Sequence, residues 1–269
     1  MTLDDAQLAR LKQIAIDAGT AILSVYQRDD FEIQRKGDDS PLTAADLAAH
    51  KIIQQGLQAL TPDIPQLSEE AADIPFETRQ GWQRYWCIDP LDGTKEFINR
   101  NGEFTVNIAL IDNHRSIFGM IYVPVTDELY WGGDGEAWKQ TGNSPAQPIR
   151  CRTVSQQLTL IASRRHGQDK NVSLLAELEG RFTQVETVNK GSSVKMCLIA
   201  EGQADLYPRL FPTSEWDTAA AQAIVEAAGG VLLNANTLQP LRYNQRESLE
   251  NPWFIVAGDP DFPLDKLQI

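Results

Sequence analysis

The pattern of apolar and polar positions predicts two helices at the start of the chain. Over residues 3–27, apolar side chains recur every three or four positions, which is the period of an amphipathic helix. The apolar positions are Leu8, Leu11, Ile14, Ala15, Ala18, Ile22 and Val25. A second helix is expected over residues 43–60, where Thr43 and Asp46 have the spacing of a capping box.

Between residues 84 and 132 the pattern changes to short runs that are rich in β-branched and aromatic residues. Gly, Pro, Asn and Asp separate these runs, as is typical of strands joined by turns. The runs are Tyr85–Ile88, Thr105–Ile111, Ile117–Val123 and Leu129–Trp131. They predict an antiparallel or mixed sheet with flanking helices.

After residue 150, predicted strands and helices alternate. We expect strands at 158–162, 204–207, 231–233 and 254–257, and helices at 171–178, 193–201 and 218–228. Gly229 and Gly230 follow the last helix, where glycine is a common C-cap. The Gly-, Asn- and Pro-containing segment 141–148 is predicted to be a surface loop near a boundary. The chain is therefore expected to be a layered α/β protein in two parts, 1–150 and 151–269.

Composition and charge narrow the class of protein. Apolar residues make up 42% and charged residues 23%, the usual mix of a soluble globular protein, and no run approaches the ~18–20 apolar residues of a spanning helix. The net charge of −13 argues against binding a nucleic-acid polymer. The three cysteines, Cys87, Cys151 and Cys197, lie far apart, so we expect reduced thiols in the cytoplasm and no thiolate zinc site.

The most informative segment is Asp89-Pro90-Leu91-Asp92-Gly93-Thr94. A strand is expected to deliver Asp89 at its end, with Pro90 ending the ladder and Asp92 following in a turn. Two carboxylates and the Leu91 carbonyl are oxygen ligands of the kind that Mg²⁺ prefers. Gly93 and Thr94 then open a short helix, 94–99, whose N–H groups suit a phosphate. The alternative is an ordinary acidic turn in which both Asp residues accept backbone hydrogen bonds.

Two further acidic positions extend this hypothesis. Glu69 and Glu70 form a carboxylate pair in a predicted turn, and Asp217 opens an Ala-rich helix. The glutamates could equally be solvated surface charges. Asp217 could equally be a helix N-cap, because Asp is among the preferred residues there.

These motifs together resemble those of a known group of enzymes. DPLDGT and WDTAAAQAIVEAAGG are similar to the two signature motifs of the inositol monophosphatase superfamily, the lithium-sensitive, Mg²⁺-dependent phosphatases. The likeness runs from Ser40 almost to the C-terminus. DGTKEF, NGEFTVNIALI, GSSVKMC and AEGQADLYPR resemble the bacterial CysQ branch, the 3'(2'),5'-bisphosphate nucleotidases. Leu42 stands where valine is expected, a conservative change.

The resemblance implies an inositol monophosphatase/fructose-1,6-bisphosphatase-like αβαβα architecture and a centre with two or three Mg²⁺ ions. The implied metal ligands are Glu69, Asp89, the Leu91 carbonyl, Asp92 and Asp217. The implied catalytic residues are Thr94 and Asp46, which would orient the attacking water, and Glu69, which would help to accept its proton. For Asp46 the capping box remains the alternative explanation.

The resemblance also implies how the substrate is held. The implied contacts are Glu69, Leu91, Asp92, Gly93, Thr94, His166, Ser192, Lys195, Arg209 and Asp217. Of these, Ser192, Lys195 and Arg209 would contact the second phosphate and the ribose, and His166 the nucleotide. The implied reaction is hydrolysis of adenosine 3',5'-bisphosphate to AMP and phosphate, in sulfate assimilation and nucleotide recycling. The alternatives are an inositol or sugar phosphatase on the same scaffold, and a non-catalytic nucleotide- or metal-sensing module. A homodimer, and peripheral attachment to the cytoplasmic face of the inner membrane, are left open.

Overall fold

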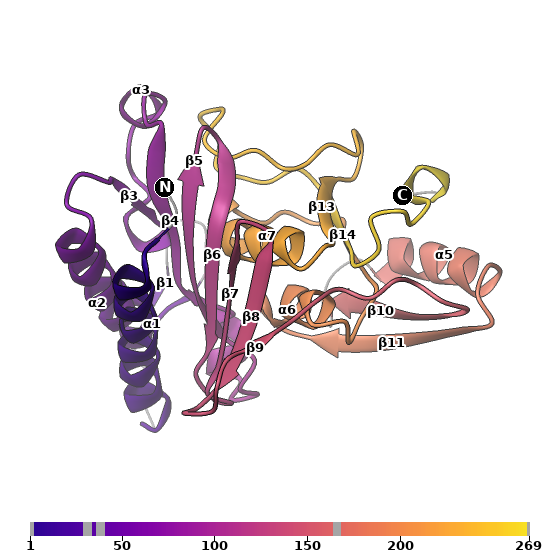
Figure 1. Ribbon diagram of the computed structural model, residues 1–269, viewed down its shortest axis with the longest axis horizontal. Coiled ribbons are helices and arrows are strands. Elements are labelled where there is room, and N and C mark those ends of the chain that lie inside the picture. Colours follow the sequence, from indigo (N-terminus) through magenta and orange to yellow (C-terminus); the bar gives the residue numbers. More distant parts are fainter. Residues whose placement is uncertain (1–2, 29–33, 36–40, 164–167, 268–269) are drawn as a thin grey trace.

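The computed structural model describes residues 3–28, 34–35, 41–163 and 168–267, and it shows alternating layers of helices and sheets (Figure 1). A helix pair covers one face of a seven-stranded sheet, and further helices separate this sheet from a five-stranded one. Another helix lies on the far side of the second sheet. The predicted layered α/β fold is confirmed. No helix within the described ranges is both long and apolar enough to span a bilayer.

The outer helix pair consists of α1 (Asp5–Tyr26) and α2 (Ala44–Leu60). Both begin with a capping box, in which Asp4 and Thr43 are the N-cap residues. The predicted helix 3–27 was therefore slightly too long at its start, because Asp4 is the N-cap and the helix begins at Asp5. The expected apolar face is confirmed, since Leu11, Ile14 and Ile22 of α1 are almost fully buried.

The seven-stranded sheet is mixed, which is one of the two arrangements that the sequence predicted. Its strands lie in sequence order, and only the first pair, β3 and β4, is parallel. The strands are β3 (Gln66–Ser68), β4 (Arg84–Asp92), β5 (Thr105–Asp112), β6 (Arg115–Val123), β7 (Glu128–Gly133), β8 (Glu136–Thr141) and β9 (Gln147–Pro148). The predicted loop 141–148 is wrong in part, because it contains β9 and the last residue of β8. Short helical segments η1 (Glu69–Ala71), α3 (Phe76–Arg79) and α4 (Thr94–Ile98) lie between the first strands.

The second sheet has the strand order β11-β10-β12-β14-β13 and is also mixed. Its strands are β10 (Gln157–Ser163), β11 (Gln184–Lys190), β12 (Leu206–Arg209), β13 (Val231–Asn234) and β14 (Phe254–Ala257). Helices α6 (Val194–Ala200) and α7 (Glu215–Ala227) lie between the two sheets, and α5 (Gln168–Glu179) lies outside. The remaining described elements are two short strands that pair antiparallel, β1 (Gln34–Arg35) and β2 (Pro41–Leu42), and the helical turn η2 (Leu264–Lys266).

Three apolar clusters fill the spaces between the layers. One lies between α1, α2 and the first sheet, one between the two sheets, and one under α5. The first sheet is buried on both faces: Trp86 and Ile88 belong to the first cluster, whereas Tyr85 and Cys87 belong to the second. The middle cluster takes residues from both sheets. The two predicted parts, 1–150 and 151–269, thus share one apolar cluster. Their division stays a prediction.

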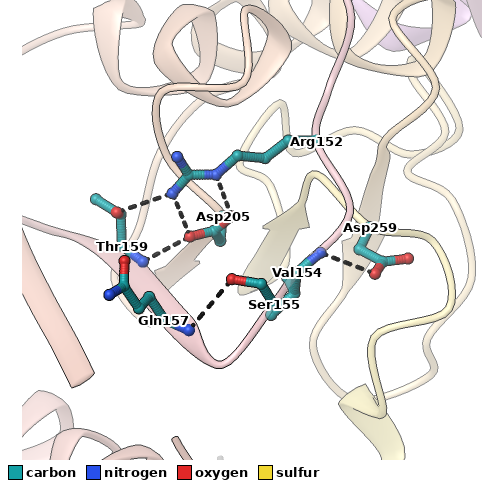
Figure 2. Close-up of polar contacts among 7 residues, drawn as sticks. All are labelled: Arg152, Val154, Ser155, Gln157, Thr159, Asp205 and Asp259. Atoms are coloured by element: carbon teal, nitrogen blue, oxygen red, sulfur yellow. Dashed lines mark hydrogen bonds and ion pairs between the residues drawn. The ribbon is translucent and has the colours of Figure 1, made fainter. Parts of the chain in front are cut away.

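The connector between the sheets is held by a buried carboxylate (Figure 2). Asp205 is fully buried and accepts two hydrogen bonds from the Arg152 guanidinium, at 2.7 and 2.6 Å, and one from the Thr159 amide at 2.6 Å. Nearby, the Val154 amide donates to Asp259 at 3.1 Å. A bidentate pair of this kind fixes geometry as well as charge. The connector is thereby anchored to β10 and to the segment that precedes β12.

A glycine determines how closely α7 approaches the first sheet. A Cβ atom at Gly119 of β6 would lie 1.9 Å from the carbonyl oxygen of Ala220 in α7, so the helix would have to move. We expect Gly119→Ala to lower the free energy of unfolding by about 3 kcal/mol, as overpacked cores do. Urea denaturation measures this. The matched control is Gly81→Ala, where a Cβ atom meets nothing within 4 Å, and a similar loss there would contradict the packing explanation.

Candidate functional site

The end of β4 brings two carboxylates to one place. The strand was expected to end at Pro90, but it continues to Asp92, so that prediction is wrong. The pairing with β5 shifts between Asp89 and Asp92: Asp89 pairs with Asn107 and Asp92 with Thr105. The extra residue is a local bulge, which re-aims side chains in the way that bulges beside functional sites do.

Helix α7 supplies the third carboxylate. Asp217 was considered as an N-cap, but the N-cap is Ser214, and Asp217 is the third residue of the helix, where one of its oxygens accepts from the Ser214 amide at 2.7 Å. Ligand oxygens of Asp89, Asp92 and Asp217 all lie within 4.8 Å of one another. The prediction of Asp217 as the N-cap is therefore wrong; Asp217 completes the capping box of Ser214 and also belongs to the carboxylate cluster.

Glu69 reaches the same cluster from the edge of the sheet. Parallel pairing of β3 with β4 places Ser68 opposite Ile88, which brings the following residue, Glu69, next to Asp89. Burial raises the pKa of Asp89 well above its usual range, and the charge of Glu69 and a hydrogen bond with it add to the shift. Burial, followed by the charges of Asp92 and Glu69, raises the pKa of Asp217 to about 7. The four carboxylates thus repel one another in a poorly solvated space.

This group of side chains fits a hard divalent cation. All its side-chain donors are carboxylate oxygens, and a cation would relieve the repulsion that raises the pKa values of Asp89 and Asp217. Leu91 is buried, and its carbonyl oxygen lies 3.4 Å from the Thr94 hydroxyl, at the edge of hydrogen-bond distance. The Leu91 amide donates to Asp89 at 3.0 Å, which fixes the intervening turn.

Asp46 serves two partners with its two oxygens. Oδ2 accepts from the amide and the hydroxyl of Thr43, at 2.8 and 2.5 Å, and so closes the capping box of α2. Oδ1 accepts from the hydroxyl of Thr94 at 3.2 Å. Asp46 is 1% exposed, so its carboxylate is shielded from water. The two readings of Asp46 therefore do not exclude each other.

The residues assigned to the second phosphate gather near the start of α6. Ser192 and Lys195 are 8% and 7% exposed, and Arg209 ends β12. Burial, together with the charge of Arg209, lowers the pKa of Lys195 to about 8, while the charges of Asp92, Glu96 and Asp217 oppose this shift. Both cations are thus electrostatically coupled to the carboxylate cluster. His166 lies outside the described residues.

Sequence reasoning missed Ser193, which joins the two groups. Its amide donates to Asp92 at 2.5 Å, and its hydroxyl lies 2.7 Å from that of Thr105 and 2.8 Å from the side-chain oxygen of Asn107. The start of α6 is thereby fixed to β5 and to a carboxylate of the cluster. The sequence signal for these contacts was weak: Ser193 lies in the motif GSSVKMC, and Thr105 and Asn107 lie in NGEFTVNIALI.

Two further contacts bring the same segments together. The carboxylate of Glu103 accepts a hydrogen bond from the Gly191 amide at 2.8 Å. It also forms an ion pair with the Lys190 ammonium at 3.4 Å. Gly93 has a φ of +93°, and a Cβ atom there would lie 3.0 Å from the Glu103 carbonyl oxygen and 3.3 Å from the Cβ of Ser192. Glycine at position 93 is therefore required both by its backbone conformation and by the close approach of these loops.

The fold and the site together define a layered α/β protein with a carboxylate centre suited to a divalent cation, beside a cationic pair in which Lys195 is buried and Arg209 half-buried. The sequence profile of the inositol monophosphatase family matches residues 4–257. The chain belongs to the inositol monophosphatase family.

Several proteins that are similar to this chain are named as nucleotidases. The chain is 50% identical, over 93% of its length and 99% of the relative's, to the 3'(2'),5'-bisphosphate nucleotidase CysQ of Salmonella typhimurium. It is 35% identical, over 97% and 96%, to the protein of the same name from Haemophilus influenzae. The crystal structure of CysQ from Bacteroides thetaiotaomicron superposes with a TM-score of 0.82 at 42% identity, covering 93% of this chain and 96% of that one. An inositol monophosphatase from Thermotoga maritima, at 18% identity and a TM-score of 0.73, shares the fold.

Proposed function

We propose that this protein is a Mg²⁺-dependent 3'(2'),5'-bisphosphate nucleotidase that hydrolyses adenosine 3',5'-bisphosphate to AMP and phosphate, in sulfate assimilation and nucleotide recycling. The observation that carries the proposal is a pair of adjacent subsites of opposite charge. The carboxylates of Asp89, Asp92 and Asp217 suit a cation that would engage one phosphate, and Lys195 with Arg209 suit a second phosphate. The names of the relatives at up to 50% identity support this assignment.

The carboxylate cluster is the proposed metal-binding part. Glu69, Asp89, the Leu91 carbonyl, Asp92 and Asp217 would hold two or three Mg²⁺ ions, of which Asp89, Asp92 and Asp217 lie close enough to share one. Bound magnesium supplies positive charge where negative charge develops during phosphoryl transfer. Gly93 would allow the backbone to approach the same phosphate.

The hydroxyl of Thr94 has a defined orientation that suits catalysis. Because it donates its one hydrogen to Asp46, its oxygen lone pairs can accept a hydrogen bond from the attacking water. Thr43 donates a hydrogen bond to Asp46 in turn, and this fixes the carboxylate that orients the Thr94 hydroxyl. Glu69, whose carboxylate lies beside Asp89, would accept the proton that the water releases.

Substrate turnover tests the proposal directly. Purified protein with Mg²⁺ should release phosphate from adenosine 3',5'-bisphosphate at micromolar concentration, and chelation or Li⁺ should suppress the release. Inositol 1-phosphate and fructose 1,6-bisphosphate, assayed side by side, distinguish the nucleotidase from an inositol or sugar phosphatase. No phosphate release from the bisphosphonucleotide would reject the assignment, and binding without turnover would favour the non-catalytic module.

Replacing Lys195 should weaken recognition of the second phosphate selectively. A hydrogen bond to a charged group contributes about 1.5–3 kcal/mol, so we expect Lys195→Ala to raise KM for adenosine 3',5'-bisphosphate roughly 10- to 100-fold. Adenosine 3'-monophosphate lacks the second phosphate, and its KM should change much less. Steady-state kinetics with both substrates measure the difference. An equal rise in both KM values would place Lys195 outside the second-phosphate subsite.

We also propose a cytoplasmic location. The thiols of Cys87, Cys151 and Cys197 are all unpaired, which suits a reducing compartment. The homodimer, the peripheral attachment to a membrane and the role of His166 stay predictions.

A further inference from the structure

Helix α2 carries a histidine one turn after Asp46. His50 follows Asp46 by four residues, so both side chains lie on the same face of the helix, about 6 Å apart along its axis. Asp46 accepts the hydrogen bond from the Thr94 hydroxyl. Nδ1 of His50 lies 2.9 Å from the hydroxyl oxygen of Ser68, the residue that precedes Glu69. One face of α2 therefore contacts two separate segments of the candidate site.

Strand pairing explains why the Ser68 hydroxyl reaches this helix. Ser68 lies opposite Ile88 in the parallel pair of β3 and β4, so the two side chains point to the same face of the sheet. Ile88 belongs to the apolar cluster between α1, α2 and that sheet. Ser68 is 3% exposed and therefore lies within the same layer. The hydrogen bond between Ser68 and His50 thus agrees with the register of the sheet.

Ser68 is also the N-cap residue of the short helical turn η1, yet its hydroxyl does not cap that turn. Serine is a favoured N-cap because its hydroxyl accepts from an amide of the first turn. Here the side chain makes no such bond, and its hydroxyl is joined to His50 instead. The turn begins at Glu69 and contacts α2. The hydroxyl therefore fixes the start of this turn to α2 and not to the amides of the turn itself.

We propose that His50 is a positioning residue that acts through Ser68 on the carboxylate of Glu69. The inference rests on the proposed function, in which Glu69 binds the cation and accepts the proton of the attacking water. Asp46 holds the Thr94 hydroxyl that orients this water, and His50 holds the turn that carries the proton acceptor. Because both come from one face of a single helix, α2 sets the distance between the two groups.

Calorimetric titration with Mg²⁺ alone tests this assignment. Residues that orient metal ligands typically contribute about 10- to 100-fold to metal affinity, so we expect His50→Ala to raise the dissociation constant of Mg²⁺ about tenfold. Ser68→Ala should raise it equally. The double variant should lose no more than either single variant, because both changes remove the same hydrogen bond. Losses that multiply in the double variant, or an unchanged constant in Ser68→Ala, would overturn the proposal.

His50→Asn is the conservative variant. Burial lowers the pKa of His50, so its ring is uncharged in slightly alkaline solution, and asparagine is uncharged as well. The asparagine amide lies at the position of Nδ1 and can donate or accept a hydrogen bond. We expect His50→Asn to recover most of the Mg²⁺ affinity that His50→Ala loses. An asparagine variant as weak as the alanine variant would show that the hydrogen bond is not what matters, and the proposal would fail.

His114→Ala is the matched control. Nδ1 of His114, which is half-buried like His50, lies 2.8 Å from the carbonyl oxygen of Tyr243. His114 lies in the turn between β5 and β6, at the opposite end of β5 from Thr105. Its Mg²⁺ dissociation constant should stay unchanged, and an equal rise in both alanine variants would indicate a general loss of stability and overturn the proposal. Thermal melting shows which variants fold, and if His50→Ala does not, Ser68→Ala and His50→Asn decide the outcome.

Failure of the proposed function is distinguishable from failure of this inference. Mg²⁺ affinity that depends on His50, in a protein that releases no phosphate from adenosine 3',5'-bisphosphate, would reject the nucleotidase and retain the role of His50. A protein that hydrolyses the bisphosphonucleotide, but whose Mg²⁺ affinity is the same in His50→Ala, would do the reverse.

Discussion

Asp217→Asn is expected to remove most of the phosphatase activity and, at the same time, to stabilise the metal-free protein. The asparagine oxygen can still accept from the Ser214 amide, so the capping box and the start of α7 are retained. What is lost is one of the three charges that lie within 4.8 Å of one another. Metal ions contribute several kcal/mol to stabilising charge in the transition state, so we expect kcat/KM to fall by about 10³-fold or more.

The stabilising effect follows from the raised pKa of Asp217, which is about 7. An acid whose pKa is higher in the folded state than in the unfolded state destabilises the fold once it ionises. The cost is therefore largest above pH 7 and shrinks as the pH falls toward 4. At pH 8 in chelator we expect Asp217→Asn to melt higher by a few degrees, since 1 kcal/mol corresponds to about 2–4 °C in a chain of this size.

Calorimetric melting with and without Mg²⁺ measures both sides of this prediction. The unchanged protein should gain stability from Mg²⁺ and the variant much less, because the ion has lost a ligand. Asp73→Asn is the matched control, since it removes the same charge from an exposed position. A variant that keeps full activity and the full response to Mg²⁺ would remove Asp217 from the metal-binding set.

Thr94→Ala is expected to lower kcat strongly while leaving KM nearly unchanged. Its hydroxyl is held by Asp46 and is the group we assign to orienting the attacking water. Correct positioning for proton transfer typically contributes about 10²–10⁴-fold, so a fall in kcat of about 10²- to 10³-fold is expected. Thr94→Ser keeps the hydroxyl and should recover most of the rate. Equal losses in the alanine and serine variants would show that the methyl group, and not the hydroxyl, matters.

Asp46→Asn tests the direction of the same hydrogen bond. With Oδ1 replaced by an amide nitrogen, the side chain would donate to Thr94 instead of accepting from it. The threonine hydrogen would then turn toward the water, which removes the acceptor. We expect kcat to fall about as far as in Thr94→Ala, although α2 keeps an oxygen for its cap. Single-turnover measurements separate this effect from product release, and a normal rate would leave Asp46 with its capping role alone.

Elements with strong local signals could be predicted from the sequence, whereas those that depend on their neighbours could not. The apolar stripe of α1 and the capping box of α2 both depend on residues that are near one another in the sequence, so both helices were predicted. Strand β11 was missed because it is a sheet edge on which Glu186 and other polar residues alternate with half-buried ones. Strand β3 was missed because three residues are too few to show a period.

The same distinction holds for the candidate site. Asp89 and Asp92 were found because a short motif places them together, and Asp217 because the resemblance linked two distant motifs. Ser193 and Glu103 were not found, because their importance lies in contacts with residues about ninety to a hundred positions away in the sequence. The roles of Asp46 and Asp217 were left divided between cap and function. A carboxylate can accept from more than one partner, and only the tertiary structure shows that Asp46 contacts Thr94 as well as Thr43, and that Asp217 lies in the carboxylate cluster as well as in a capping box.

The hydrogen bond from the Ser193 amide to Asp92 has a thermodynamic consequence. It makes one carboxylate common to the proposed cation site and to the turn that begins α6, on which Ser192 and Lys195 lie. If binding of Mg²⁺ or of the nucleotide moves the Asp92 carboxylate closer to the position that the other ligand requires, the affinity for each ligand depends on the presence of the other. Such linkage is reciprocal, so the factor by which Mg²⁺ tightens nucleotide binding must equal the factor by which the nucleotide tightens Mg²⁺. The protein would then discriminate between substrates partly through the affinity of its own cation.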